Sequence, residues 1–140
     1  MEVKCYDYLP LDSKKIRIRV FMDEQGFVNE FDDIDNKANH IVIYDNGIAL
    51  GTCRFFYNDK RNSYQLGRIA VLKEYRGRKI GNLLLSSAEL EIKKRNGNLI
   101  ELLAQERASK FYLKNGYIKL NEKEYDEGCP HIWMKKEIKK

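Results

Sequence analysis

The apolar residues of this 140-residue chain change their spacing near residue 80, and this change most constrains the fold. From Tyr64 to Val71 the residues favour a strand, whereas the apolar residues between Ile80 and Arg95 recur at helical spacing. A polar stretch with glycines at positions 77 and 81 joins the two patterns. The chain therefore places a glycine-bearing loop between the end of a strand and the start of a helix.

Further strands and helices are predicted on both sides of this segment. Asp12 or Ser13 can cap the first helix, Gly26 ends it, and the acidic stretch 30–35 is interpreted as a short turn or helix in a loop. Turn residues at 45–47 indicate a hairpin. The predicted strands are 2–8, 40–44, 48–57, 64–71, 99–104, 117–120 and 131–136, and the predicted helices are 11–25, 80–95 and 108–114. This order predicts a single α+β domain over residues 1–140, with helices flanking a mixed central β-sheet.

Composition narrows the class of protein. Hydrophobic residues make up 43% and charged residues 34%, enough for a buried core. The net charge of +5 raises the hypothesis of nucleic-acid binding, but 21 acidic residues are interspersed with the basic ones. The only compact basic cluster is Arg76, Arg78 and Lys79, which suits a small polyanion better than a duplex.

The opening residues contain no apolar segment of the kind that a signal peptide has, and no apolar run approaches the length of a membrane span. Cys5, Cys53 and Cys129 lie far apart and lack metal-ligand spacing. We therefore expect a cytoplasmic protein with reduced thiols and no metal.

The loop at residues 76–82 has the chemistry of a phosphate site. A helix N-terminus presents unpaired N–H groups and a positive partial charge, and glycines let a backbone approach phosphate oxygens closely. Three cations, at positions 76, 78 and 79, can add charge-assisted hydrogen bonds. From this loop alone, a polar loop that merely caps an ordinary helix is an equally good interpretation.

The segment resembles the cofactor motif of the GNAT acetyltransferase superfamily, Arg/Gln-x-x-Gly-x-Gly/Ala after an apolar strand ending. Arg76 and Gly81 match the outer anchors, whereas Lys79 stands where the middle glycine is expected. Gly77 lies two residues earlier, as in members that read Tyr-Arg-Gly-x-Gly. We expect Lys79 to be tolerated if its φ is negative.

A second segment, 108–117, resembles the other hallmark of this superfamily, a Phe-Tyr pair on a short helix that ends in Gly-Phe/Tyr. The strand 102–105 before it matches the one that diverges from its neighbour to admit pantetheine. The segments 19–25 and 128–134 are similar to the ElaA-type branch of the superfamily. The resemblance implies a GNAT-like fold and acetyl transfer from acetyl-CoA to a primary amine within a ternary complex.

The resemblance also implies roles for individual residues. Tyr112 is the candidate general acid, acting mainly as a hydrogen-bond donor to the leaving thiolate, although a structural core tyrosine is an alternative. The backbone amides of residues 69–71 are candidates to meet the oxyanion and pantetheine. The candidate cofactor-binding residues are Ile69, Ala70, Val71, Arg76, Gly77, Arg78, Lys79, Ile80, Gly81, Asn82, Gln105, Phe111 and Tyr112.

The general base is less constrained. Glu24, at the end of the first helix, is the leading candidate, with His40 and His131 as alternatives. The carboxylates at 32, 33 and 35 can attract a cationic amine, but a solvated acidic loop is the favoured interpretation.

Two other classes of function stay open, a catalytically weak acyl-CoA-binding or sensing module and a nucleic-acid-binding protein. The latter lacks the interleaved aromatic and basic strand of a single-strand platform. The acceptor is an unidentified small molecule or peptide, a homodimer is an open possibility, and neither a membrane nor a nucleic-acid partner is expected.

Overall fold

The computed structural model describes residues 1–139, and within them seven strands form one mixed sheet in the order β1-β2-β3-β4-β5-β7-β6. All neighbouring strands are antiparallel except β4 and β5, which are parallel. The strands are β1 (Glu2–Tyr6), β2 (Asn39–Asp45), β3 (Ile48–Asn58), β4 (Ser63–Val71), β5 (Leu99–Gln105), β6 (Ile118–Asp126) and β7 (Cys129–Glu137). The predicted mixed sheet is confirmed.

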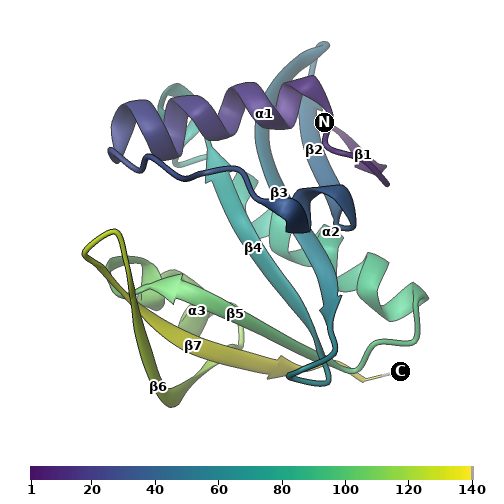
Figure 1. Cartoon of the computed structure of the whole chain (residues 1–140). Helices are drawn as coiled ribbons and strands as arrows, with labels where there is room; N and C mark the ends of the chain where they lie inside the picture. The colour runs from purple at the N-terminus through teal and green to yellow at the C-terminus, as the bar shows by residue number, and fades with distance from the viewer. Residues whose placement is uncertain (140) are drawn as a thin grey trace.

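Helices cover both faces of this sheet (Figure 1). Helix α2 (Ile80–Lys94) links the parallel strands β4 and β5, because such a crossover needs a long connection. Its apolar stripe is buried against β2, β3 and β4, which confirms the helical spacing seen in the sequence. Helix α1 (Leu11–Arg17) lies on the opposite face. The short helix α3 (Ser109–Lys114) follows β5.

The first helix differs from its prediction in two ways. It begins after Pro10 without a side-chain cap: Ser13 instead shares a 2.7 Å hydrogen bond with Thr52, and Asp12 accepts one from Tyr44 at 2.7 Å. The side chains that were expected to cap the helix thus form hydrogen bonds with residues of the sheet instead. From residue 18 the chain continues as a π-helix, η1 (Ile18–Glu24), whose apolar residues pack on Ala70 and on Leu72.

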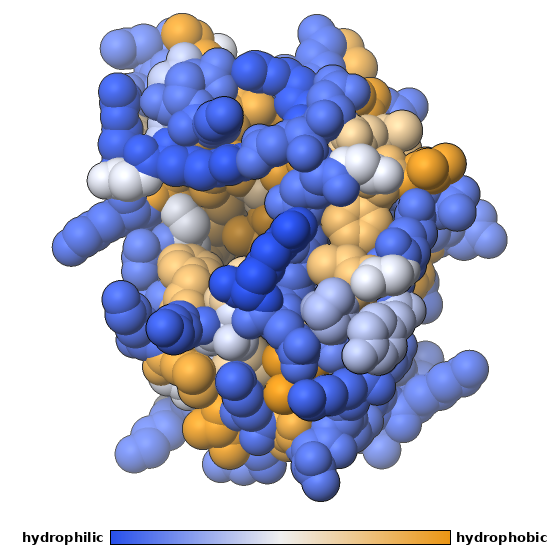
Figure 2. Space-filling model, turned by 90° about the vertical axis from the view of Figure 1, so that its left-hand side faces the viewer, coloured by the Kyte–Doolittle hydropathy of each residue, from blue (hydrophilic) through white to orange (hydrophobic). Residues whose placement is uncertain are grey.

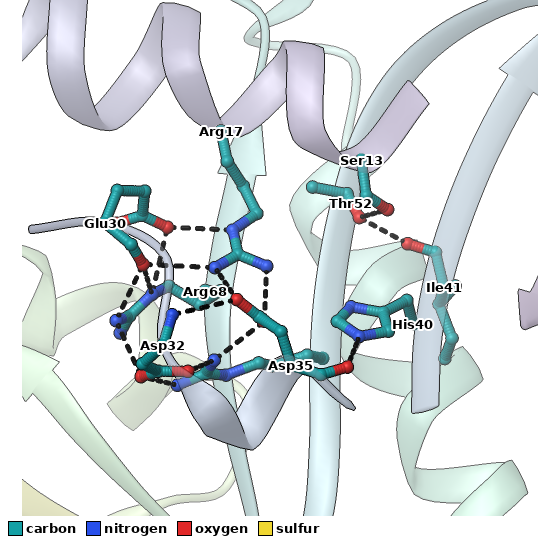
Figure 3. A network of polar contacts seen from close by, with 10 residues as sticks. Ser13, Arg17, Glu30, Asp32, Asp35, His40, Ile41, Thr52 and Arg68 are labelled. Carbon is teal, nitrogen blue, oxygen red and sulfur yellow. Dashed lines mark hydrogen bonds and ion pairs between the residues drawn. The ribbon is translucent and has the colours of Figure 1, made fainter. Parts of the chain in front are cut away.

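The acidic stretch contains the short helix that was expected, but its carboxylates are not all solvated. It forms a 3-10 helix, η2 (Asp33–Asn36), and Asp35 is buried at 3% exposure. Asp35 accepts hydrogen bonds from Arg17 and Arg54, both at 2.8 Å (Figure 3). Arg17 also binds Glu30 at 2.8 Å. These ion pairs occupy the carboxylates, so Asp35 is not free to attract an amine.

The last hairpin is longer than predicted. Strand β6 runs through residues 121–126, which lie between the predicted strands 117–120 and 131–136. Its side chains are exposed along almost its whole length because it is an edge strand. An edge strand whose two faces are both exposed to solvent lacks the apolar alternation by which strands are recognised in a sequence.

In residues 1–139, no helix combines the length and apolar character that a membrane crossing requires.

Candidate functional site

The two parallel strands diverge along their length, and this divergence opens the site. Strands β4 and β5 pair only through Tyr64 with Ile100 and Gln65 with Glu101. Beyond these pairs a cavity of about 160 Å³ lies between the strands, lined on one side by residues 66–69 and on the other by residues 102–105. The divergence expected of the strand 102–105 is therefore present. We call this space the small cavity.

A β-bulge accounts for the divergence. Thr52 of β3 pairs with Ala70 and Arg54 pairs with Gly67, so that two residues of β4 face one residue of β3. Arg68, in the bulge, has a φ of 51°, which is unusual for a non-glycine residue. Its guanidinium is held by an ion pair to Glu30 at 2.9 Å. Because a bulge bends its strand, the end of β4 turns away from β5.

A second cavity of about 420 Å³, the large cavity, begins where β4 ends. It is bounded by the end of β4, the loop before α2, the first residues of α2, and α3. Its lining consists of Val20, Gln25, Ile69, Ala70, Val71, Tyr75, Arg76, Gly77, Lys79, Ile80, Gly81, Asn82, Ala108, Phe111 and Tyr112. All but two of the predicted cofactor-binding residues therefore gather around one space. Of those two, Gln105 lines the small cavity, and Arg78 stacks over the ring of Tyr75 at 5.5 Å.

The backbone of the loop before α2 is shaped by two residues with positive φ. Gly77 has a φ of 84°, and Lys79, which precedes the helix, has a φ of 60° and a ψ of 25°. The condition under which Lys79 was expected to be tolerated, a negative φ, is not met: Lys79 adopts the left-handed conformation that glycine adopts without strain. The first intrahelical bond runs from Leu83 N–H to the Lys79 carbonyl, so the N–H groups of residues 80–82 have no helical partner.

Gly81 contributes in a different way, through close packing. A Cβ atom at this position would lie 3.1 Å from the ring of Phe111, which is tighter than ordinary van der Waals contact. The glycine thus lets α3 pack closely against the start of α2. This close approach brings the two predicted signatures together in space.

Arg76 and Glu24, which were predicted to bind the cofactor and to act as the base, bind each other. The guanidinium donates to both carboxylate oxygens, at 2.6 and 2.9 Å, and its Nε donates to the Val71 carbonyl. The hydrogen bonds from Arg76 lower the pKa of Glu24. Glu24 lines neither cavity. A carboxylate with a lowered pKa is a weaker base, so this pairing weighs against Glu24 in that role.

Four residues line both cavities: Gln25, Ile69, Ala108 and Tyr112. Tyr112 therefore lies at the junction of the two spaces. Burial raises the pKa of its hydroxyl, which makes no hydrogen bond within residues 1–139. Gln105 donates a 2.8 Å hydrogen bond to Gln25 and so joins β5 to the residue after η1. Figure 2 shows the face that carries the end of η1 and the β6–β7 turn, where a hollow with apolar residues in its depth is ringed by hydrophilic ones.

The two histidines have different surroundings. His40 is fully buried beside η2, where Nε2 contacts the Asp35 carbonyl oxygen at 3.0 Å, and burial lowers its pKa. It lines neither cavity. His131, on β7, lines the small cavity together with Asp126 of β6. Of the three candidate bases, only His131 contributes to a cavity wall.

Several residues of the small cavity were not singled out in the sequence. Phe27, Glu30, Arg68 and Asp126 come from segments that are far apart in the chain, and no local motif marks them. The sequence around Arg68 held one indication of the bulge, since a charged residue next to Gly67 interrupts the apolar–polar alternation of β4. The others are brought together by the sheet order and by the loop between η1 and η2.

Comparisons with known proteins agree with this fold. A sequence profile described as the acetyltransferase (GNAT) domain matches residues 12–138. The chain is 35% identical over 129 residues to the uncharacterized N-acetyltransferase YjcF of Bacillus subtilis, covering 90% of this chain and 91% of that protein. Among solved structures, Escherichia coli ElaA superposes with a TM-score of 0.82 at 25% identity, covering 96% of this chain and 99% of ElaA. A Lactobacillus plantarum protein superposes with a TM-score of 0.88 at 25% identity, covering 97% of each chain.

Proposed function

Because this chain belongs to the GNAT family of N-acetyltransferases, in its ElaA-type branch, we propose that it transfers the acetyl group of acetyl-CoA directly to a primary amine. The observation that carries the proposal is the meeting of two cavities at Tyr112. The large cavity has the features of a site for a phosphorylated carrier. The small cavity suits the acceptor. Because the two cavities share a wall, acetyl-CoA and the acceptor can bind side by side in a ternary complex.

The large cavity fits the pyrophosphate of acetyl-CoA. The free N–H groups of residues 80–82 and the left-handed backbone at Gly77 and Lys79 form a concave donor surface at a helix N-terminus. Arg76, Arg78 and Lys79 surround it with positive charge. In this proposal the phosphates bind these N–H groups and cations. Phe111, which packs on Gly81, forms the neighbouring part of the cavity wall.

The end of β4 supplies donors to the reacting thioester. Beyond Gln65 the edge of β4 that faces β5 has no strand partner among residues 1–139, so backbone groups along residues 66–71 are open to a ligand. We assign the amides of Ile69, Ala70 and Val71 to pantetheine and to the oxyanion that develops during transfer. Preorganised donors of this kind are commonly worth about 3 to 4 kcal/mol.

Tyr112 is assigned to the leaving thiolate. Since burial raises its pKa, the phenol stays protonated and acts as a hydrogen-bond donor rather than giving up its proton early. Its place in the walls of both cavities supports this role. The general base stays a separate question, because Glu24 is held by Arg76.

The size of the small cavity bears on the acceptor. A volume of about 160 Å³ is well below the range of about 300 to 1,000 Å³ of pockets that enclose drug-sized ligands. Only the amine-bearing end of an acceptor fits between β4 and β5. A small amine or the end of a flexible chain, such as a lysine side chain, meets this requirement.

The proposal is tested with a panel of primary amines and acetyl-CoA, with thiol release and acetylated product as paired readouts. We expect turnover of at least one amine and loss of acetyl-CoA binding when Gly81 is changed to Val, which would collide with Phe111. Thiol release without an acetylated product would indicate hydrolysis. Tight binding of acetyl-CoA without turnover of any amine would favour the acyl-CoA-sensing alternative.

A further inference from the structure

His131 lies where the acceptor amine of the proposed reaction would bind. It is on β7, paired with Gln105 of β5 on one side and with Glu124 of β6 on the other. It is only 8% exposed and lines the small cavity, whereas it takes no part in the large one. Tyr112 belongs to the walls of the same small cavity. The imidazole of His131 and the phenol of Tyr112 thus belong to residues that line the same cavity.

The hydrogen bonding of His131 fixes its tautomer. Nδ1 lies 2.9 Å from the carbonyl oxygen of Cys129. A carbonyl oxygen only accepts, so Nδ1 must carry the hydrogen. In the neutral ring Nε2 then holds a lone pair, which is the state that a general base needs.

Nε2 of His131 is also accessible. It makes no hydrogen bond within residues 1–139, yet it is not sealed off. Among residues 1–139, the only side-chain nitrogen or oxygen that is shielded from solvent and also lacks a hydrogen-bond partner is Nδ1 of His40. Nε2 of His131, which also lacks a partner, is therefore exposed to solvent. Since His131 is almost fully buried and lines the small cavity, we infer that Nε2 is reached from that cavity.

Other groups that titrate near this cavity are mostly engaged. Glu124 accepts a 2.6 Å hydrogen bond from the indole of Trp133, and Glu30, which lines the cavity, is paired with Arg68. Asp126 is exposed on the rim. The titratable or charged groups that line the small cavity beside His131 are Glu30, Arg68, Tyr112 and Asp126. Its other near neighbours of this kind include Cys129, Glu124, and the ion pair of Lys123 with Glu106 at 3.3 Å. Only Asp126 is a carboxylate of this cavity without an ion pair in residues 1–139.

We propose that Nε2 of His131 is the general base that removes the proton from the acceptor ammonium, an inference that rests on the proposed acetyl transfer. The neutral amine then attacks the thioester carbonyl, the new C–N bond forms and the C–S bond breaks. The nitrogen loses its second proton to solvent as the amide forms, and the thiolate leaves as a thiol after protonation through water beside Tyr112. Cys129 holds the ring, and the unpaired carboxylate of Asp126 favours a cationic acceptor.

The test uses His131→Asn, because the asparagine amide can still donate to the Cys129 carbonyl but carries no base. With a saturating amine, the kcat of the wild type is expected to fall on the acidic side as imidazole gains a proton. In His131→Asn we expect kcat to fall by about a hundredfold or more and the acidic limb to disappear, with acetyl-CoA affinity unchanged. An unchanged kcat with the same limb would overturn the proposal.

A second readout does not depend on turnover. The two-bond proton–nitrogen NMR spectrum of the free protein reports the tautomer of each histidine. We expect His131 to carry its hydrogen on Nδ1, and an added amine that is a substrate to shift the Nε2 resonance. A hydrogen on Nε2 would refute the assignment. If no amine in the panel is acetylated, the proposed function fails; if amines are acetylated equally well by His131→Asn, only the base is wrong.

Discussion

Glu24 accepts two hydrogen bonds from the guanidinium of Arg76, from Nη1 at 2.6 Å and from Nη2 at 2.9 Å. Both side chains are roughly one-third or more exposed, so this is a surface ion pair at the edge of the large cavity. The carboxylate offsets part of the positive charge that a pyrophosphate would meet. Glu24 and a bound anion therefore compete for the same donors.

We expect Glu24→Gln to bind acetyl-CoA about twofold to fivefold more tightly, because an exposed ion pair of this kind is worth up to about 1 kcal/mol. The acidic limb of the rate profile should be retained. Glu74→Gln is the matched control, since Glu74 forms a similarly exposed pair with Arg19 and lines neither cavity. Calorimetry measures the affinity. Disappearance of the acidic limb in Glu24→Gln alone would restore Glu24 as the base.

Lys79 carries a backbone conformation that costs a side-chain-bearing residue about 1 to 2 kcal/mol. We expect Lys79→Gly to leave the free energy of unfolding unchanged or to raise it by up to about 1 kcal/mol, since glycine relieves strain but loosens the unfolded chain. Acetyl-CoA affinity should stay within about threefold. Lys79→Ala, which removes the cation and keeps the strain, is the control. A large loss of affinity in both variants would mean that the side chain, not the backbone, holds the phosphates.

Tyr112→Phe keeps the ring that packs on Phe111 and removes only the hydroxyl at the junction of the cavities. We expect kcat to fall at least tenfold, because the leaving thiolate loses its hydrogen-bond donor, with little change in acetyl-CoA affinity. Single-turnover measurements at saturating amine separate the chemical step from product release. An unchanged rate of that step would show that Tyr112 is structural.

The parts of this site that could be predicted from sequence are local. The loop 76–82 and the Phe111-Tyr112 pair are each contained in one short segment, and the change of apolar spacing at residue 80 is visible without a structure. The left-handed conformation of Lys79 could not be predicted, because only the path of the chain into α2 imposes it.

The small cavity could not be predicted for a different reason. Its wall depends on a bulge at Arg68, on a loop held by buried ion pairs, and on a hairpin whose strand β6 has no apolar face. Charged residues such as Asp32 and Asp35 look solvated in a sequence, since their arginine partners are about twenty residues away. Pairing between distant segments decides their role.

Asp35 makes stability depend on pH in a defined direction. Burial acts to raise its pKa, but hydrogen bonds and charge from Arg17 and Arg54 outweigh burial and lower the pKa from 3.8 to about 2. Its contribution is therefore present above pH 4 and is lost as pH falls toward 2, by about 2 kcal/mol. Asp35→Asn should lose about 3 to 5 kcal/mol at neutral pH because two buried arginines lose a counter-charge.

Denaturant unfolding across pH measures both effects. Asp33→Asn is the matched control, because Asp33 lies in the same helix and is exposed. We expect its stability and pH profile to follow the wild type. A similar loss in the two variants would contradict a specific role for the buried pair of Asp35 with the arginines.

Glu127, at the tip of the β6–β7 hairpin, holds the loop that follows η1. Its carboxylate accepts N–H groups of Val28 and Asn29 at 2.9 to 3.2 Å, and these hydrogen bonds lower its pKa. Phe27, which precedes Val28, and Asp126, which precedes Glu127, both line the small cavity. The contact therefore joins two walls of the proposed acceptor site.

We expect Glu127→Ala to raise the KM for the acceptor amine severalfold while leaving acetyl-CoA affinity unchanged, because the loop and the hairpin lose their shared anchor. Glu122→Ala removes a carboxylate from β6, the strand that leads into this turn, where Glu122 pairs with Arg61 away from both cavities, and it serves as the control. Steady-state kinetics with each substrate varied in turn separates the two sites. Equal KM values for the two variants would mean that the walls of the acceptor site hold their positions without Glu127.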